Sequence, residues 1–320
     1  MNSFNTAVLL VTFTRLSTTE KVLNSIREVR PPRLYIASDG PRQSKIGEKD
    51  KIDQVRDYIL KNINWECEVK TLFRDENLGC GPSVNNAISW FFEQEEMGII
   101  LEDDTLPDHS FFYFCQELLL RYKDDQRIGM ISGNNHVSSF QVNESYIFSK
   151  FKWTWGWATW RRSWVNQDIN LYVLETPYRK SVVNNMGYTF KSINHWEGNI
   201  SKLKSKSVSA WDYQWFLSLS AQNQLGIFPA VNLVANIGFG EDATHCSGEA
   251  QQKFLVANAI SFPLKHPKYI LPNIDFDMCY EKKNVYVDTI FNKIIPSPIK
   301  SFLKKFYRFL LRKIIKYPIK

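Results

Sequence analysis

Long apolar runs are missing from this sequence. None of its stretches reaches the roughly 18 consecutive apolar residues that a membrane-spanning helix requires. The apolar run at residues 7–11 is too short for a secretory signal and has no basic region before it, so we expect no leader. The cysteines are few, odd in number and without CxxC spacing: Cys67, Cys80, Cys115, Cys246 and Cys279. This pattern excludes a disulfide framework and a cysteine zinc site, and it favours reduced thiols in the cytoplasm.

A broad basic surface is also missing, although the formal net charge is +7. Nine Lys and Arg residues and no acid lie between Lys293 and Lys320, so the rest of the chain carries a net charge of about −2. A charge distribution of this kind argues against a nucleic-acid partner. The basic character belongs to the C-terminal tail alone.

The first 135 residues alternate between two kinds of segment. Buried strands are predicted at residues 7–14, 34–37, 66–73, 98–101 and 128–132, and helices at 18–29, 50–61, 81–92 and 109–122. Such alternation predicts an α/β fold with a mainly parallel sheet and helices on both faces.

Beyond residue 135 the alternation breaks down. A helix is predicted at 211–224, a strand at 227–234, and irregular chain from 263 to about 284. We therefore divide the chain into an α/β half at 1–135, a second half of the same domain at 136–285 that binds the acceptor and carries catalysis, and a basic tail at 286–320.

A cluster of three acids, Glu102, Asp103 and Asp104, follows the apolar run at residues 98–101. Ligand sites of open α/β sheets lie at the carboxyl ends of the strands. Carboxylates repel one another, and a divalent cation held by one or two of them plus substrate phosphates is a common reason to keep them together. A solvated turn is the alternative for an isolated cluster of this kind.

Two further strand ends carry polar groups. Thr12 and Arg15 follow the first predicted strand, and Asp39 follows the second. An arginine, an aspartate and a metal-binding acid cluster at neighbouring strand ends suit a nucleotide diphosphate. Taken singly, Arg15 could be a surface cation and Asp39 a turn cap, but their common position at strand ends favours a binding site.

Several motifs occur in a recognisable order: the strand-end Arg15 and Asp39, the acids at 102–104, Trp155-Gly156-Trp157, the segment 211–215 (WDYQW) and the segment 239–245 (FGEDATH). Over roughly residues 6–250 the chain resembles the GT-A glycosyltransferases, especially the N-acetylglucosaminyltransferase I type and related bacterial sugar transferases. The resemblance implies a Rossmann-like fold of the nucleotide-diphospho-sugar transferases.

The resemblance also implies roles on the donor side. Asp104 would coordinate Mn²⁺ (or Mg²⁺), which bridges the phosphates of a UDP-sugar, and Glu102 and Asp103 would contact the ribose or metal-bound water. Arg15 and Asp39 would face the uracil. The remaining residues assigned to the nucleotide-sugar are Thr12 and Ser83. Ser83 stands about where the N-acetylglucosaminyltransferase I type uses a histidine, and this leaves the base and the donor sugar open.

On the acceptor side, the resemblance places the general base of an inverting transfer on Asp212, next to Trp211. The alternative role for Asp212 is to cap the helix that follows. Trp155, Gly156 and Trp157 would form a loop near the acceptor, although such dense aromatic sequence is usually core. His245 would ligate the metal or touch the phosphates, or be an ordinary loop histidine.

The tail has a mixed basic and apolar pattern. Between residues 299 and 320, Ile, Leu and Phe residues share one helical face and most Lys and Arg residues lie on the other. A basic amphipathic helix of this composition is typical of an interfacial membrane anchor, and docking on protein is the alternative. We expect a cytoplasmic protein that is peripheral on the membrane.

Together these features predict a metal-dependent glycosyltransferase, an inverting one by resemblance. It would move a sugar from a nucleotide-sugar to a saccharide or lipid-linked saccharide acceptor in surface polysaccharide assembly. Two alternatives stay open: a catalytically inactive, membrane-associated saccharide-binding protein and a sugar-1-phosphate nucleotidyltransferase. The latter would need a Gly-rich loop after the first strand, and residues 11–15 contain no glycine.

Overall fold

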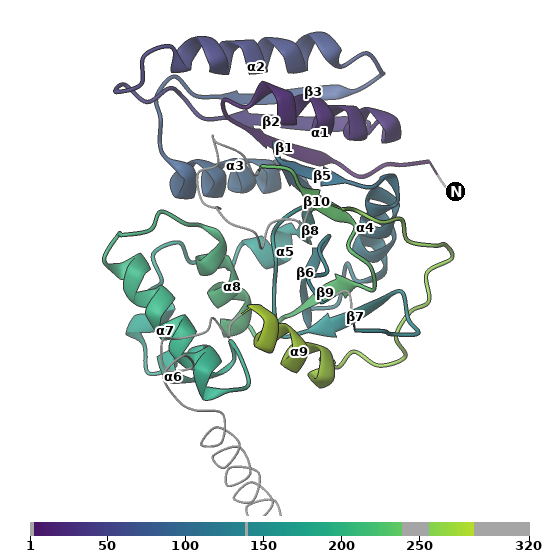
Figure 1. Ribbon diagram of the computed structural model, residues 1–320, viewed down its shortest axis with the longest axis vertical. Helices are drawn as coiled ribbons and strands as arrows, with labels where there is room; N and C mark the ends of the chain where they lie inside the picture. The colour runs from purple at the N-terminus through teal and green to yellow at the C-terminus, as the bar shows by residue number, and fades with distance from the viewer. Residues whose placement is uncertain (1–2, 138–139, 239–255, 285–320) are drawn as a thin grey trace, which may run out of the picture.

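The fold is taken from a computed structural model, in which residues 3–137, 140–238 and 256–284 are described (Figure 1). Its strands are β1 Val8–Thr12, β2 Arg33–Ser38, β3 Glu68–Phe73, β4 Met97–Glu102, β5 Thr105–Pro107, β6 Ile128–Ser132, β7 Tyr146–Ser149, β8 Trp157–Trp160, β9 Leu225–Pro229 and β10 Val234–Asn236. Its helices are α1 Leu16–Val29, α2 Glu48–Asn62, α3 Cys80–Gln94, α4 His109–Arg121, α5 Arg161–Trp164, η1 Tyr172–Glu175, α6 Arg179–Asn184, α7 Phe190–Lys204, α8 Asp212–Ala221 and α9 Ile274–Asn284.

The central sheet has eight strands in the order β3-β2-β1-β4-β8-β6-β9-β7. Strands β3, β2, β1 and β4 pair in parallel, and β8 pairs antiparallel to both β4 and β6. Strand β9 continues parallel to β6, and β7 closes the edge antiparallel to β9. Six of the eight strands therefore point the same way, and the predicted α/β fold class with a mainly parallel sheet is confirmed.

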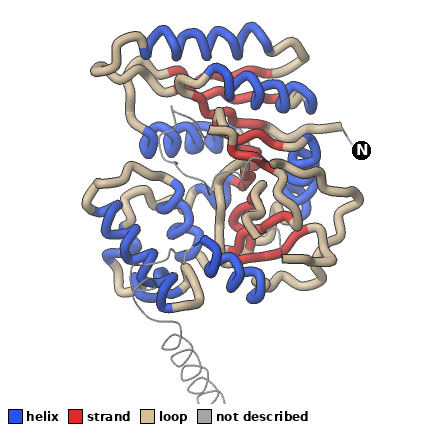
Figure 2. The backbone as a smooth tube through the Cα atoms, viewed as in Figure 1, coloured by secondary structure: helices blue, strands red, loops and turns tan. Residues whose placement is uncertain are grey.

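Helices cover both faces of this sheet (Figure 2). Alternate residues of each strand point to opposite sides, so Val8 and Leu10 of β1 pack with α1, α2 and α4, while Leu9 packs with the other helices. The second face is covered by α3, α5 and the group α6–α8, and four buried tryptophans lie on this side: Trp164, Trp196, Trp211 and Trp215. The fold is thus three layers, with the sheet in the middle.

The second half of the chain differs from the sequence-based expectation in two places. The strand predicted at 227–234 ends at Pro229, and its last residue begins the separate strand β10, which pairs with β5. The irregular chain predicted up to 284 contains helix α9. Burial of Phe276 and Tyr280 in a third apolar cluster orders this helix, which the short local pattern did not reveal. The division of the chain near residue 135 stays a prediction.

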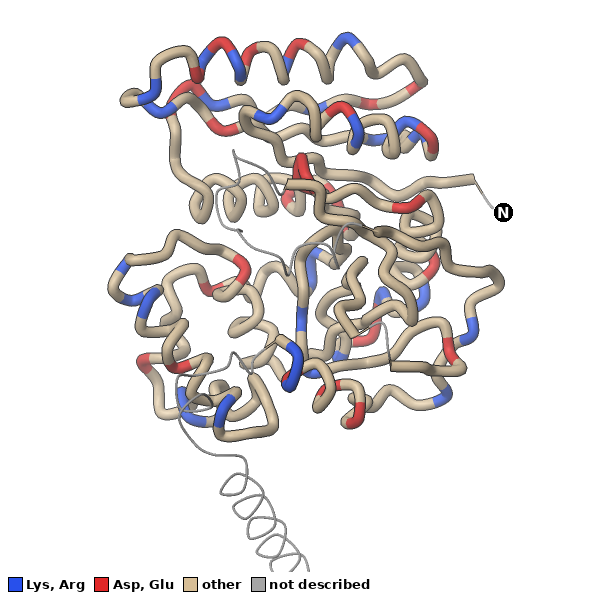
Figure 3. The backbone as a smooth tube through the Cα atoms, in the orientation of Figure 1, with Lys and Arg blue, Asp and Glu red and all other residues tan. Residues whose placement is uncertain are grey.

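Acidic and basic side chains are interleaved on the surface helices of the N-terminal half, as Figure 3 shows for α1 and α2. In the part of the chain that the structure describes, no helix is long and apolar enough to cross a membrane. The amphipathic tail proposed as an anchor lies outside the described residues.

Candidate active site

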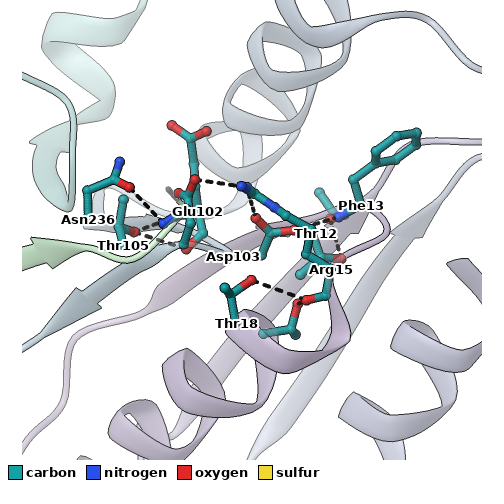
Figure 4. A network of polar contacts seen from close by, with 12 residues as sticks. Thr12, Phe13, Arg15, Thr18, Glu102, Asp103, Thr105 and Asn236 are labelled. Carbon is teal, nitrogen blue, oxygen red and sulfur yellow. Dashed lines mark hydrogen bonds and ion pairs between the residues drawn. The ribbon is translucent and has the colours of Figure 1, made fainter. Parts of the chain in front are cut away.

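The candidate site lies at the carboxyl ends of β1, β2 and β4, which are neighbours in the sheet. Arg15 immediately precedes α1, Asp39 follows β2, and Asp103 and Asp104 follow β4. The parallel pairing of these strands brings side chains from three distant parts of the sequence to one edge of the sheet, as expected. Figure 4 shows the Arg15 side chain reaching across this edge toward Asp103.

Arg15 is held by two of the three acids. Its Nη2 donates to Oδ1 of Asp103 and forms an ion pair with Oδ2 of Asp104 at 2.9 Å. Asp103 is buried and also accepts the backbone N–H of Phe13 at 3.2 Å. Burial alone would disfavour the charged guanidinium, but the two carboxylates outweigh it and raise the pKa of Arg15. The guanidinium of Arg15 is therefore paired with two carboxylates of the cluster.

Glu102 is the third acid of the cluster. Burial, followed by repulsion from Asp104, Asp103 and Asp212, raises the pKa of its carboxyl to about 8. Burial is also the largest effect on Asp103, whose pKa rises to about 6 despite the ion pair with Arg15. Acids with raised pKa values crowded at a strand end are a recurring property of functional sites.

Asp39 organises the loop beside the site. Its carboxylate accepts backbone N–H groups from Leu78 and Gly79 at 3.1 Å, and the Asn77 side-chain amide at 3.0 Å. The Gly40 N–H also donates to it. The structure therefore engages Asp39 with its own chain, and a contact with a nucleotide base would be additional to these bonds.

Arg56 of α2 was missed in the sequence because nothing in the polar pattern of that helix distinguishes it. Its guanidinium lies over the Phe73 ring and donates to the carbonyls of Ser38, Asp39 and Arg74. These bonds tie the ends of β2 and β3 together. Arg56 thus supports the loop that carries Asp39.

The start of α3 meets the start of α8 at this site. The Gly81 N–H donates to Oγ of Ser209 at 3.2 Å, which places the chain just before Asp212 beside α3. Cys80 is exposed, yet its thiol is crowded by protein atoms. This crowding, followed by the carboxylates of Glu102 and Asp212, raises its pKa to about 12. Neither Cys80 nor Ser209 had a distinctive sequence signal.

Asp212 is the first residue of α8, a position where a carboxylate is also favoured by the helix dipole. It is half-buried, and its charge contributes to the raised pKa values of both Glu102 and Cys80, so it lies near both groups. The structure therefore brings the proposed base and the acid cluster together. The capping alternative is compatible with this placement.

Two further donor-side residues occupy supporting positions. The Thr12 hydroxyl donates to the carbonyl of Ala37 at 3.4 Å, between β1 and β2. Ser83 lies in the first turn of α3, and its N–H donates to the carbonyl of Gly79 at 2.9 Å. Both residues are buried, so they support the backbone around the site and are not exposed to a ligand.

The tryptophan-rich loop divides into an open and a buried part. Trp155 is half-buried, and its ring lies 5.2 Å from Trp153 and 5.5 Å from His136. Trp157, by contrast, is fully buried in β8 and stacks on the buried Trp211 at 5.6 Å. Trp157 and Trp211 therefore support the loop as core residues, and Trp155 is the one that can face a ligand.

Glycine is required at the turn of this loop. Gly156 has φ +61°, and a Cβ there would lie 2.7 Å from a methyl group of Val234. The β5–β10 pair then continues past the acids, because the Ile237 N–H donates to the Asp104 carbonyl at 2.8 Å. A Cβ on Gly238 would come within 2.2 Å of Oδ2 of Asp104. Ile237 and Gly238 thus pack closely against Asp104.

The described residues contain no group of three or more His, Cys, Asp or Glu side chains arranged to hold a metal. His245 and the 239–245 motif lie outside those residues. Asp104 is the more exposed partner of Arg15, since its side chain is 17% exposed against 4% for Asp103. This donor set fits a cation that is held by Asp104 together with substrate phosphates.

No family model and no curated protein matches the chain. Among solved structures, it is similar to a cytidylyltransferase from Leptospira borgpetersenii (10% identity, 56% of this chain and 72% of that one, TM-score 0.33). It is also similar to an apo UDP-glucose pyrophosphorylase (8%, 69% and 89%, TM-score 0.33) and to mouse xyloside xylosyltransferase 1 (9%, 68% and 83%, TM-score 0.29). At these scores the matches add nothing to the α/β architecture already described.

Proposed function

We propose that the chain is a GT-A-type glycosyltransferase that moves a sugar from a UDP-sugar or similar nucleotide-sugar to a saccharide acceptor. The observation that supports this most is the meeting of two distant elements. The end of β4 carries Glu102 and Asp104, and the start of α8 carries Asp212, whose charge acts on Glu102; the chain just before α8 contacts the start of α3 through Ser209 and Gly81. A leaving diphosphate and an acceptor hydroxyl need these two groups at one site.

The reaction assigned to this geometry is a direct displacement at the anomeric carbon. Asp212 accepts the proton of the acceptor hydroxyl as its oxygen bonds to that carbon. The bond between the anomeric carbon and the diphosphate oxygen breaks, and the nucleotide diphosphate leaves with the electron pair. Mn²⁺ or Mg²⁺ bound at Asp104 would stabilise the charge on the departing phosphates. Arg15 adds a second positive charge at the same edge.

A panel of nucleotide-sugars tests this proposal. The purified full chain is incubated with each donor in the presence of Mn²⁺ and, separately, of EDTA, beside the variants Asp104→Ala and Asp212→Ala. We expect slow release of nucleoside diphosphate from one donor, abolished by EDTA and by Asp104→Ala. Absence of both turnover and metal-dependent nucleotide binding would overturn the enzyme proposal and favour a saccharide-binding protein that lacks catalysis.

A sugar-1-phosphate nucleotidyltransferase is the second candidate, because an enzyme of that class would also use a nucleotide-binding α/β domain with a metal ion. The loop after β1 argues against it. The Phe13 N–H in that loop already donates to Asp103, so this backbone group is engaged within the protein and does not point to a triphosphate. Release of pyrophosphate from a nucleoside triphosphate and a sugar-1-phosphate would decide for this candidate.

The acceptor is proposed to be lipid-linked, because a basic amphipathic segment next to anionic lipid would bring the protein to such a substrate. Deletion of residues 299–320 tests this. We expect the shortened chain to lose binding to vesicles that contain anionic phospholipid, while it retains turnover on a water-soluble acceptor. Unchanged vesicle binding would show that the segment is not the membrane anchor.

A further inference from the structure

The acid cluster at the end of β4 already has a cation of its own. One nitrogen of Arg15, Nη2, contacts Oδ1 of Asp103 (Figure 4) and also Oδ2 of Asp104. A divalent cation that binds to Asp104 must compete with a guanidinium for the same carboxylate oxygen. Two like charges cannot share that oxygen closely without an additional anion between them.

Arg15 has little freedom to withdraw. Its backbone carbonyl accepts the N–H and the hydroxyl of Thr19 at 3.1 and 2.7 Å, which fixes the residue at the start of α1. On its outer side, Nη1 lies 2.7 Å from where a Cβ on Gly238 would stand. On its inner side, the guanidinium is held by its ion pair with the buried Asp103. Arg15 can exchange one partner, Asp104, far more readily than it can leave the site.

A phosphate group can replace Asp104 as the second partner of Arg15. It carries negative charge and matches the planar guanidinium fork as well as a carboxylate does. When a diphosphate is present, Arg15 keeps Asp103 and turns its second contact to a phosphate oxygen, which frees Asp104. The same phosphates then complete the small ligand set that the protein supplies for the cation.

We propose that Arg15 is a positioning residue that closes Asp104 to divalent cations until a nucleotide diphosphate binds, so that metal and nucleotide bind interdependently. This inference rests on the proposed function, because it concerns the same donor site. It assigns Arg15 to the phosphates, whereas the family resemblance assigned it to the base. By linkage, each ligand must raise the affinity for the other by the same factor.

The test measures Mn²⁺ binding by the loss of the electron paramagnetic resonance signal of free Mn²⁺, after subtraction of the Mn²⁺ that UDP or pyrophosphate binds in titrations without protein, and no turnover is involved. Full-length wild type, Arg15→Met and Arg15→Lys are titrated with MnCl₂ alone, with UDP and with inorganic pyrophosphate. In wild type we expect weak binding of Mn²⁺ alone and about tenfold tighter binding with UDP or pyrophosphate.

The variants separate the role of the guanidinium from a general loss of structure. Arg15→Met removes the competing charge, so Mn²⁺ alone should bind about tenfold more tightly than to wild type, and UDP should add much less. Arg15→Lys keeps a point charge without the fork and should fall in between. Asp104→Asn in the Arg15→Met background should abolish the gain, which locates it at Asp104. Circular dichroism and thermal unfolding check that each variant is folded.

The possible failures are distinguishable. If UDP strengthens Mn²⁺ binding equally in wild type and in folded Arg15→Met, or if Arg15→Met binds Mn²⁺ alone no more tightly, the role of Arg15 is overturned and the proposed function stands. If none of the nucleoside diphosphates UDP, GDP and CDP supports Mn²⁺ binding by wild type, both proposals fail together.

Discussion

Two groups of buried charges in this protein are satisfied in different ways. At the end of β4, the acids Asp103 and Asp104 share one arginine, and Glu102 faces other carboxylates. At the opposite part of the sheet, Asp277 of α9 accepts the Ser149 hydroxyl, the Lys150 N–H at 3.1 Å and the Tyr188 hydroxyl at 2.8 Å.

The difference is the one expected between acids that bind a ligand, as proposed for the β4 cluster, and acids that stabilise the fold. At Asp277, two hydroxyls and a backbone N–H donate to the buried carboxylate and satisfy it within the fold. Carboxylates that face one another leave a demand for positive charge, which a protein keeps only where a ligand can meet it. Asp39 belongs with Asp277 by this criterion, since its oxygens are occupied by backbone and amide donors.

The largest effect should come from the proposed base. Asp212→Asn keeps a favourable residue at the start of α8 but removes the proton acceptor, so kcat should fall by about 10²- to 10⁴-fold. The free energy of unfolding should change by only about 0.5 kcal/mol, from the lost interaction with the helix dipole. Steady-state kinetics and thermal unfolding measure the two quantities. A variant that keeps wild-type kcat would remove Asp212 from the mechanism.

The opposite response is expected at α9. Asp277→Ala leaves the buried hydroxyls of Ser149 and Tyr188 without their acceptor, and we expect the free energy of unfolding to fall by about 3 kcal/mol. Nucleotide affinity of the folded fraction should be unchanged. Urea unfolding and a nucleotide titration check both statements. If Asp277→Ala lost nucleotide binding but kept its stability, Asp277 would have a ligand-binding role and the distinction between the two groups of acids would be wrong.

Lys152 extends the comparison to a buried amine. It donates to the Ser220 hydroxyl at 2.8 Å, and burial lowers its pKa to about 7. In the unfolded chain its pKa is about 10.4, so between these values the unfolded state binds more protons and stability rises with pH. Relative to Lys152→Met, wild type should gain up to about 1.4 kcal/mol per pH unit between pH 7 and 10. Parallel stability curves for the two proteins would contradict a neutral buried Lys152.

The smallest effect concerns Cys80, at the mouth of the proposed donor site. UDP with Mn²⁺ should slow its alkylation by N-ethylmaleimide about tenfold at a nucleotide concentration of ten times Kd. The exposed Cys279 in α9 is the internal control and should react at an unchanged rate. Peptide mass spectrometry gives both rates. Equal protection of both thiols would indicate a global effect of the nucleotide.

The sequence predicted the features that depend on local pattern. Apolar runs followed by polar residues located β1, β2 and β4 with Arg15, Asp39 and Asp104 at their ends, and parallel pairing then brings these ends together. The roles that the family resemblance gave to these residues stay predictions. The placement of their side chains is now known.

Features that depend on distant partners were not predictable in the same way. The insertion of β8 between β4 and β6 is decided by pairing across the chain, and so Trp157 is a core residue instead of a loop residue. Helix α9 has weak local preference and is ordered by contacts with residues more than 40 positions away. Arg56 donates to backbone carbonyls, and Ser209 accepts a backbone N–H. Side-chain bonds to the backbone of a distant segment leave no pattern in the sequence.

The most direct test of the central claim is to identify the phosphorus-containing product formed from the turned-over nucleotide-sugar by ³¹P nuclear magnetic resonance. The account predicts a nucleoside diphosphate, formed with Mn²⁺ by wild type and not by Asp104→Ala, because the bond that breaks is the one to the anomeric carbon. Formation of sugar-1-phosphate and a nucleoside triphosphate on addition of pyrophosphate would contradict it and identify a nucleotidyltransferase.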